Sequence, residues 1–189
     1  VLDRPALEAA VGDLVERHES LRTIFPDTLG VPRQVILDAG VARPRLSVTA
    51  VEEASLAGAL SGAARTGFDL AREPPLRVHL FALGEIEHVV LLLLHHIAGD
   101  GWSLAPLLRD LGRFYEARCQ GQAAAIAALP VQYADYTLWQ HAVLGSEEDG
   151  ESAIARQLSF WTSQLAGLPD QLDLPLDRAR PAVSSYRGG

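Results

Sequence analysis

The chain has 189 residues, 48% of them hydrophobic, and carries a formal net charge of −8 at pH 7. This length and composition are enough for one folded core and exclude an intrinsically disordered chain. The basic residues are all arginine and lie scattered along the chain, which excludes the basic stripe that binds a nucleic-acid backbone.

The first part of the sequence predicts helices alternating with strands. Asp3 and Pro5 favour the start of a helix, and apolar residues at helical spacing extend it to about His18. Residues 31–37 are predicted to form a strand. Apolar and polar residues alternate over 46–50, which predicts a half-buried strand.

A helix and two more strands follow. The helix is expected over 53–65, in a segment rich in small residues. Apolar residues alternate over 76–82, and after a turn near Gly84 the residues of 88–95 are apolar on both faces. We expect 88–95 to be the central strand of the sheet, because a strand covered on both sides reads as a continuous apolar run.

The remaining chain is predicted to be mostly helical. Ser103 can cap a helix with an apolar stripe that ends near Gly121, and shorter helices are expected over 133–144 and 154–165. From Asp170 onward we expect an irregular segment. The predicted fold class is α/β (α+β), with a mixed sheet covered by helices in one lobe.

Targeting signals and disulfides are not predicted. Leu91–Leu94 is too short to cross a bilayer, and no charged-then-apolar signal peptide opens the chain. The single cysteine, Cys119, can form no internal disulfide and has no companion at metal-ligand spacing. We expect a cytoplasmic protein without membrane partners, and a piece of a longer chain because the sequence has no methionine.

The stretch from Leu91 to Ser103, LLLLHHIAGDGWS, joins an apolar strand to polar residues. Successive side chains on a strand point to opposite faces, so His95 and His96 are expected to have different surroundings and roles. Loops at strand ends often carry function, and His96 adjoins the loop that contains Asp100.

Three interpretations of this stretch are open from the residues alone. The histidines can be satisfied by core hydrogen bonds, with Asp100 and Gly101 in a plain turn. A metal site is a second interpretation, but adjacent strand histidines point apart and no third ligand stands at a familiar spacing. The third is general base catalysis by an imidazole, with glycines 99 and 101 allowing a tight turn and leaving N–H groups open to an oxyanion.

Several blocks resemble the condensation domains of nonribosomal peptide synthetases. HHIAGDG, at His95–Gly101, matches the HHxxxDG signature, which acyltransferases of the chloramphenicol-acetyltransferase type share. RHESLRTIF, at Arg17–Phe25, resembles the family's RHExLRTxF block. YADYTLW, at Tyr133–Trp139, resembles YxDYAxW, with Thr137 where alanine is usual. FDLAREPPLR, at Phe68–Arg77, is also similar to the family, and the blocks stand in the family's order.

The resemblance implies one half of a V-shaped domain made of two chloramphenicol-acetyltransferase-like lobes. Residues 1–169 would form the N-terminal lobe without the family's first block, and residues 170–189 would lead toward an absent C-terminal lobe. The implied enzyme is of the acyltransferase type: the amine of a carrier-bound aminoacyl acceptor attacks a carrier-bound donor thioester and forms an amide. GWS, at Gly101–Ser103, is similar to the subtype that joins an L donor to an L acceptor.

The resemblance also implies the partners. The substrates would arrive on the phosphopantetheine arms of upstream and downstream peptidyl carrier proteins, so no cofactor and no metal is expected to bind the chain directly. The C-terminal lobe of the same domain and an adjacent adenylation domain would be its other neighbours. Without the second lobe, the isolated chain is expected to be inactive.

Roles are carried over only onto matching positions. His96 matches the second histidine, which would orient or deprotonate the acceptor amine or stabilise the tetrahedral intermediate, and Gly101 matches the glycine whose N–H faces the reaction centre. His95 and Asp100 match residues thought to be structural, and we expect Arg22 to be the ion-pair partner of Asp100.

Other residues have plainer expected roles. Trp102 and Ser103 are candidates for lining the substrate channel. We expect His18 and Glu19, at a helix end, to be solvated. The aromatic residues of the 133–139 block are expected to pack within the lobe, and Trp161 is expected in the core.

Two alternative functions are also consistent with parts of the sequence. One is a related acyltransferase that forms esters, which the Arg17–Phe25 and Tyr133–Trp139 blocks argue against. The other is a non-catalytic lobe that only docks carrier or monooxygenase partners. Family members of that kind usually lose the histidine signature, which is intact in this sequence.

Overall fold

The computed structural model of the chain describes residues 1–170, 172, 175, 177–179 and 181–183. The chain forms two compact units, residues 1–138 and 139–189. The predicted segment 170–189 lies partly outside the described residues. The helices are α1 (Arg4–Arg17), η1 (Glu19–Arg22), α2 (Ala39–Ala42), α3 (Glu53–Ala64), α4 (Gly101–Cys119), α5 (Tyr133–Leu144) and α6 (Ala153–Gln164). The strands are β1 (Thr23–Ile24), β2 (Asp27–Thr28), β3 (Val31–Pro32), β4 (Val35–Ile36), β5 (Leu46–Ala50), β6 (Leu76–Ala82) and β7 (His88–Leu94).

Helix α1 begins and ends as the sequence predicts. The Oδ1 atom of Asp3 accepts a hydrogen bond from the Ala6 N–H at 2.9 Å, and a proline lies in the first turn. This cap satisfies one of the backbone donors that a helix leaves free at its start. At the other end, the His18 N–H donates to the Leu14 carbonyl at 3.0 Å and closes the last turn.

The main sheet has the strand order β5–β6–β7. Strand β5 runs parallel to β6, and β7 runs antiparallel to it. The prediction that the strand ending in the histidines is central is therefore wrong, because β6 holds that place. Leu76, Val78 and Leu80 of β6 are at most 3% exposed, whereas no residue of β7 is fully buried. The apolar run of β7 therefore does not make it the central strand, because the number of neighbouring strands is set by pairing and not by composition.

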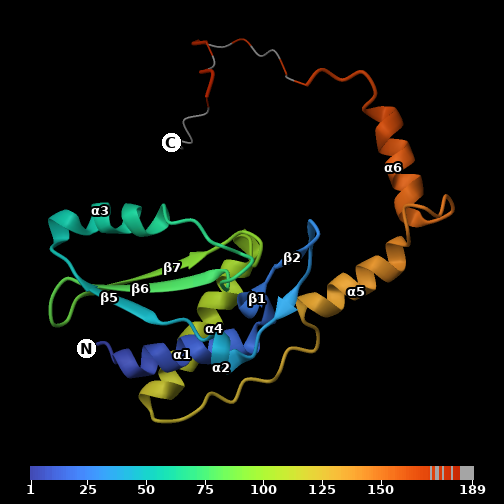
Figure 1. Ribbon diagram of the computed structural model, residues 1–189. Coiled ribbons are helices and arrows are strands. Elements are labelled where there is room, and N and C mark those ends of the chain that lie inside the picture. The colour runs from blue at the N-terminus through green and yellow to red at the C-terminus, as the bar shows by residue number, and fades with distance from the viewer. Residues whose placement is uncertain (171, 173–174, 176, 180, 184–189) are drawn as a thin grey trace. The chain divides into compact units, whose positions relative to one another are not determined.

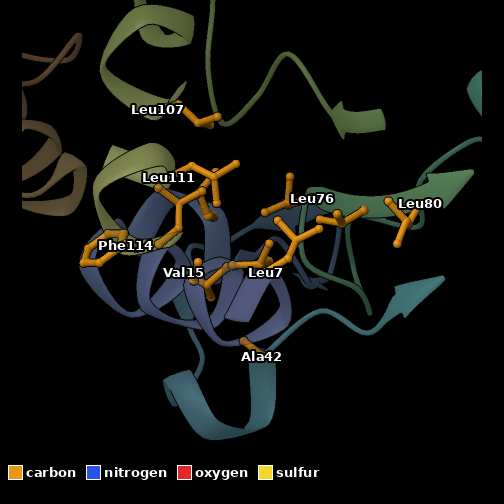
Figure 2. Close-up of a cluster of buried hydrophobic side chains, with 13 residues drawn as sticks. Leu7, Val15, Ala42, Leu76, Leu80, Leu107, Leu111 and Phe114 are labelled. Carbon is orange, nitrogen blue, oxygen red and sulfur yellow. The ribbon is translucent and has the colours of Figure 1, made fainter. Parts of the chain in front are cut away.

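The core lies between the sheet and helices α1 and α4 (Figure 1). Figure 2 shows side chains of α1, α4 and β6 gathered in this cluster. Each fully buried leucine, valine or phenylalanine contributes about 1.5–3 kcal/mol, so this layer is the main source of stability in the first unit. The labelled core residues are Leu7, Val15, Ala42, Leu76, Leu80, Leu107, Leu111 and Phe114.

Polar contacts also join α1 to α4. The Arg118 guanidinium donates two hydrogen bonds to the Asp13 carboxylate, at 2.7 and 2.6 Å. The Asp3 N–H donates to the Tyr115 hydroxyl oxygen at 3.0 Å. The helix α3 lies on the other side of the sheet (Figure 1), and none of its residues is buried. The stable layer that carries the site is therefore the α1, α4 and sheet layer.

The predicted strand over 31–37 is two short strands instead. Strand β3 pairs with β2, and β4 pairs with β1. Leu29 and Gly30 form the turn between β2 and β3 with φ angles of 57° and 79°. A two-residue turn of that kind suits a hairpin, and Pro32 removes a backbone donor that a longer ladder needs. The chain therefore forms two short pairs rather than one strand.

In the second unit, α6 begins at the Ser152 cap, whose Oγ accepts from the Ala155 N–H at 3.1 Å. The prediction that Trp161 lies in a core is wrong, because this side chain is 56% exposed and no residue of α6 is buried. The Phe160 ring packs against it in a T-shaped pair, with centroids 5.2 Å apart. Trp139, expected to pack within the lobe, is 59% exposed.

Candidate active site

His95 directly follows β7 and is held through its backbone and its ring. Its N–H donates to the Pro75 carbonyl at 2.9 Å. Its Nδ1 accepts a hydrogen bond from the Ile97 N–H at 3.0 Å, which assigns the proton of a neutral imidazole to Nε2. The Phe68 ring packs against the imidazole with centroids 5.8 Å apart and planes at 82°. The half-buried His95 side chain therefore fixes the turn that follows the strand.

His96 lies in different surroundings from His95. Strand alternation is not the reason, because β7 ends at Leu94 and both histidines follow it. It is exposed, and its imidazole makes no hydrogen bond, ion pair or ring contact with any residue that the structure describes. The imidazole borders a surface recess of about 400 Å³, named the His96 recess below. The His96 recess is lined by Ser20, His96, Ile97, Ala98, Gly99, Asp100, Ser103 and Tyr133.

Asp100 is the N-cap of α4. Its Oδ1 accepts from the Ser103 N–H at 3.0 Å and from the Ser103 hydroxyl at 2.8 Å, while the Asp100 N–H donates to the Ser103 Oγ at 3.0 Å. These reciprocal bonds form a capping box. The hydrogen bond from the Ser103 hydroxyl, followed by that from its N–H, lowers the pKa of the exposed Asp100 carboxyl. The prediction that Ser103 caps this helix is wrong in detail, since Ser103 is the partner of the cap.

Arg22 does not pair with Asp100, so that prediction is also wrong. Its guanidinium donates to the Leu37 carbonyl at 2.5 Å and to Glu19 Oε1 at 3.2 Å. Its Nε is buried without a hydrogen-bond partner among the described residues. The capping box satisfies Asp100 within one turn of helix, while Arg22 joins η1 to the segment after β4.

The glycines of the loop are not needed for an unusual backbone conformation. Neither Gly99 nor Gly101 has a positive φ. A Cβ atom on Gly99 would lie 2.7 Å from Cδ2 of Leu94 and 3.2 Å from Cβ of Ser103, so the absence of a side chain lets the loop pack closely. A Cβ on Gly101 would meet no atom within 4 Å. Because Gly101 is the first residue of α4, its N–H has no acceptor within the helix.

A second recess of about 330 Å³ is bordered by Ala98, Trp102 and Ser103, which follow the histidines in the chain. Trp102, predicted to line a channel, borders this recess and is 90% exposed. Ser103 borders both recesses, as do Ser20 and Ala98. Ser20 was not predicted from the sequence, because the family's RHExLR pattern leaves its position unspecified. The second recess is lined by His18, Ser20, Leu21, Leu94, Ala98, Trp102, Ser103, Pro106 and Leu107.

The expectation that His18 is solvated is wrong, because it binds a buried carboxylate. Asp110 of α4 is 4% exposed, and its Oδ2 accepts from Arg17 Nε at 2.9 Å and from His18 Nε2 at 3.0 Å. Arg17 also donates to the Ala127 carbonyl. A signal was present in the sequence: Asp110 interrupts the apolar stripe of α4, and a charge on a buried face needs a partner.

The pKa of Asp110 reflects two opposing effects. Burial raises it, but hydrogen bonds from His18 and Arg17 and their charges outweigh burial and lower the pKa of Asp110 below its ordinary value. A carboxyl whose pKa is lower in the folded state stabilises the fold above its unfolded pKa and loses that contribution as the pH falls through the folded value.

We therefore predict that the stability difference between the wild type and Asp110→Asn shrinks from about pH 5 downward. The asparagine side chain does not ionise, so the variant is less stable than the wild type at neutral pH. Its free energy of unfolding also depends less on pH in the acid range. Urea midpoints measured across that range check this. A difference that stays constant down to about pH 2 would contradict it.

The 133–139 block contacts the RHESLRTIF block through the residue that precedes it. The Gln132 side chain accepts from the Glu19 N–H at 3.2 Å and donates to the Arg17 carbonyl at 2.9 Å. Asp135 accepts from the Gln132 N–H at 2.9 Å at the start of α5. Glu19 is thus half-buried rather than solvated. Tyr133, expected to pack inside, is 58% exposed and lines the His96 recess.

The described residues include no group of three His, Cys, Asp or Glu side chains that could hold a metal ion. They also include no helix that is long and apolar enough to cross a membrane. The polar groups that the structure places at the loop after β7 are the His96 imidazole, the Asp100 carboxylate bound to Ser103 and the Gly101 N–H at the start of α4.

The protein-family profile described as "Condensation domain" matches residues 1–189. The chain belongs to the condensation-domain family. The predicted resemblance is confirmed by this match and by relatives that are nonribosomal peptide synthetases. The predicted α/β fold of a chloramphenicol-acetyltransferase-like lobe is confirmed as well, because the structural neighbours are condensation-type domains.

Several relatives of this condensation domain are close in sequence. A dimodular nonribosomal peptide synthase of Bacillus subtilis (strain 168) is 56% identical over 187 residues, which cover 99% of this chain and 8% of that protein. An isonitrile lipopeptide synthase of Mycobacterium tuberculosis (strain ATCC 25618 / H37Rv) is 50% identical over 190 residues, with the same shares. The X-domain from teicoplanin biosynthesis has a TM-score of 0.87 and 43% identity, over 98% of this chain and 41% of that one. The chain thus spans a small part of the length of these synthetases.

Proposed function

We propose that this condensation domain forms amide bonds in a nonribosomal peptide synthetase and that residues 1–169 are its N-terminal lobe. The donor is an acyl or peptidyl thioester on an upstream carrier, and the acceptor is an aminoacyl group on a downstream carrier. Both are delivered on phosphopantetheine arms in the cytoplasm, beside an adenylation domain. The Gly101–Ser103 stretch favours an L donor and an L acceptor. The excised lobe is inactive without its C-terminal partner.

The observation that carries this proposal is the state of His96. Its imidazole is unpaired among the described residues and faces a recess of about 400 Å³. His95 is held by the Phe68 ring and the Ile97 N–H, and Asp100 is held by Ser103. A reactive group that has no partner on a turn whose other residues are fixed is arranged to meet a substrate.

The proposed chemistry needs little more than these groups. The acceptor amine attacks the carbonyl carbon of the donor thioester, forming a C–N bond and a tetrahedral oxyanion. Collapse of that intermediate breaks the C–S bond and leaves the donor arm as a thiol, which receives the proton lost by the amine. His96 orients the amine or accepts its proton on the way. The Gly101 N–H, free of a helical acceptor, stabilises the oxyanion.

The two recesses support delivery of two substrates to one place. They share Ser20, Ala98 and Ser103, so groups that enter them separately approach the same loop. Trp102 borders only the second recess, and Tyr133 only the His96 recess. We assign Trp102 and Ser103 to the substrate channel on this basis.

A second candidate function is a non-catalytic docking lobe. The X-domain from teicoplanin biosynthesis, which has been solved in complex with OxyB, is 43% identical in sequence to this chain. That likeness favours binding of a partner protein. The intact signature with an unpaired His96 favours catalysis, and we therefore place the docking function second.

The test uses the two-lobe domain that contains this chain, with both carrier proteins loaded. Intact-mass measurement of the acceptor carrier is expected to show the mass of the donor acyl group added through an amide. A parallel reaction with a hydroxy-acid acceptor distinguishes amide from ester formation. Ester without amide would establish the ester-forming alternative. No product with fully loaded carriers would favour the docking function.

A further inference from the structure

The Phe68 ring contacts both an arginine and the first histidine of the signature. Arg77 Cζ lies 4.2 Å from the centroid of the Phe68 ring. The same ring lies 5.8 Å from the His95 ring in a T-shaped arrangement with planes at 82°. The face of an aromatic ring attracts a guanidinium that lies over it. Two rings packed edge to face at this separation also attract each other. Phe68 therefore joins Arg77 to His95.

Arg77 is itself held in place on the central strand. Its guanidinium donates to both carboxylate oxygens of Glu73, at 2.6 and 3.3 Å. It also donates to the carbonyls of Thr66 and Gly67, at 2.9 and 2.7 Å. The hydrogen bond from Arg77, with one from the Asp69 N–H, lowers the pKa of Glu73. The loop that carries Phe68 is thus tied to β6 by several charge-assisted bonds, which are the strong class of hydrogen bond.

The orientation of the His95 ring has a consequence for His96. The His95 Nδ1 accepts from the Ile97 N–H, and the His95 carbonyl accepts from the Ala98 N–H at 3.0 Å. Together these bonds set the backbone on both sides of His96. If the His95 imidazole rotated by half a turn about its Cβ–Cγ bond, the Ile97 N–H would lose its acceptor. The turn that carries His96 would then be less rigid.

We propose that Phe68 and Arg77 are positioning residues of the condensation site, acting through His95, an inference that rests on the proposed amide-forming function. The Phe68 ring holds the His95 imidazole with its Nδ1 toward the Ile97 N–H, and Arg77 holds the Phe68 ring in place. Neither side chain touches a substrate. The FDLAREPPLR block therefore has a role in the reaction that its distance along the chain from His96 does not suggest.

The main test is Phe68→Leu, which removes the ring but keeps an apolar side chain. In the chain itself, nitrogen NMR of the His95 imidazole is expected to show mixed tautomers in place of the Nε2–H form. Hydrogen exchange of the Ile97 amide is expected to quicken about tenfold. In the two-lobe domain, kcat is expected to fall about tenfold to a hundredfold, with the KM for loaded carriers nearly unchanged. Phe68→Tyr, which keeps the ring, should restore the spectra and kcat.

A matched pair of arginines controls for charge and for loop folding. Arg72 lies in the same loop and pairs with Asp69 at 3.2 Å, but its side chain is 86% exposed. Arg72→Ala is expected to leave the His95 spectra and kcat unchanged. Arg77→Lys keeps a charge but loses the planar fork that spans Glu73 and the carbonyls, and it should act in the same direction as Phe68→Leu.

The outcomes separate this proposal from the proposed function. Unchanged His95 spectra and Ile97 exchange in Phe68→Leu would overturn the positioning role, whatever the activity. Changed spectra with an unchanged kcat in an active domain would overturn it too. A wild-type domain that makes no amide would instead refute the proposed function, with the spectra still deciding whether Phe68 holds His95.

Discussion

Replacement of Asp110 by alanine is expected to lower the free energy of unfolding by about 3–5 kcal/mol, the usual cost of removing one partner of a buried ion pair. The Asp110 carboxylate is 4% exposed and accepts hydrogen bonds from Arg17 and His18, whose side chains are 15% and 21% exposed. Without it, a guanidinium and an imidazole N–H lose their acceptor in a place that water reaches poorly. Urea unfolding of the chain, followed by circular dichroism, measures the change.

A second arginine beside the same carboxylate supplies the matched control. Arg109 Nε lies 3.8 Å from Asp110 Oδ1, and the Arg109 side chain is 62% exposed. Arg109→Ala is expected to change the free energy of unfolding by no more than about 0.5 kcal/mol, because exposed pairs contribute little. Arg17→Ala should cost several times as much. Equal effects of Arg17→Ala and Arg109→Ala would show that burial of the Asp110 pair does not determine its contribution.

The network around Asp110 also shows what the sequence could and could not predict. The long helices α1, α4 and α6 and the strands β5, β6 and β7 follow from apolar spacing, because burial of one face needs only local periodicity. The short elements η1, α2, β1 and β2 were not predicted. The strand order does not follow from apolar spacing: β7 is the more apolar strand, yet the pairing of β6 with both β5 and β7 makes β6 central. In the same way, the position of His18 at a helix end predicts a solvated side chain, although His18 binds the carboxylate of Asp110, 92 positions away.

At the candidate site, the family signature located the loop but did not predict its hydrogen bonds. An ion pair between Arg22 and Asp100 was a reasonable expectation for a buried aspartate. Asp100 is exposed, however, and Ser103 lies within its reach at the third position of the helix, so a capping box forms instead. Local hydrogen bonds of this kind compete well with distant partners, because little chain entropy is lost in forming them.

The second large effect is expected at His96. In the two-lobe domain, His96→Ala is expected to lower kcat about a hundredfold to ten-thousandfold at neutral pH, the range over which general acid–base groups contribute. The fold should tolerate the change, since His96 is exposed and its imidazole has no contact with the described residues. Single-turnover transfer between loaded carriers, read by intact mass, measures the rate. His141→Ala, which removes an exposed histidine outside both recesses, is the matched control and should leave the rate unchanged.

The pH dependence of the His96→Ala defect decides which role the imidazole has. A protonated acceptor amine needs a base before it can attack, whereas a free amine needs only orientation. An α-amino group has a pKa of about 7.7–8.0, so the free amine predominates above that range. If His96 is the base, the defect is expected to narrow as the pH rises past about 8, because solvent then supplies the deprotonated amine. A defect of constant size across that range would assign His96 to orientation of the amine alone, and a rate equal to the wild type at every pH would remove it from the reaction.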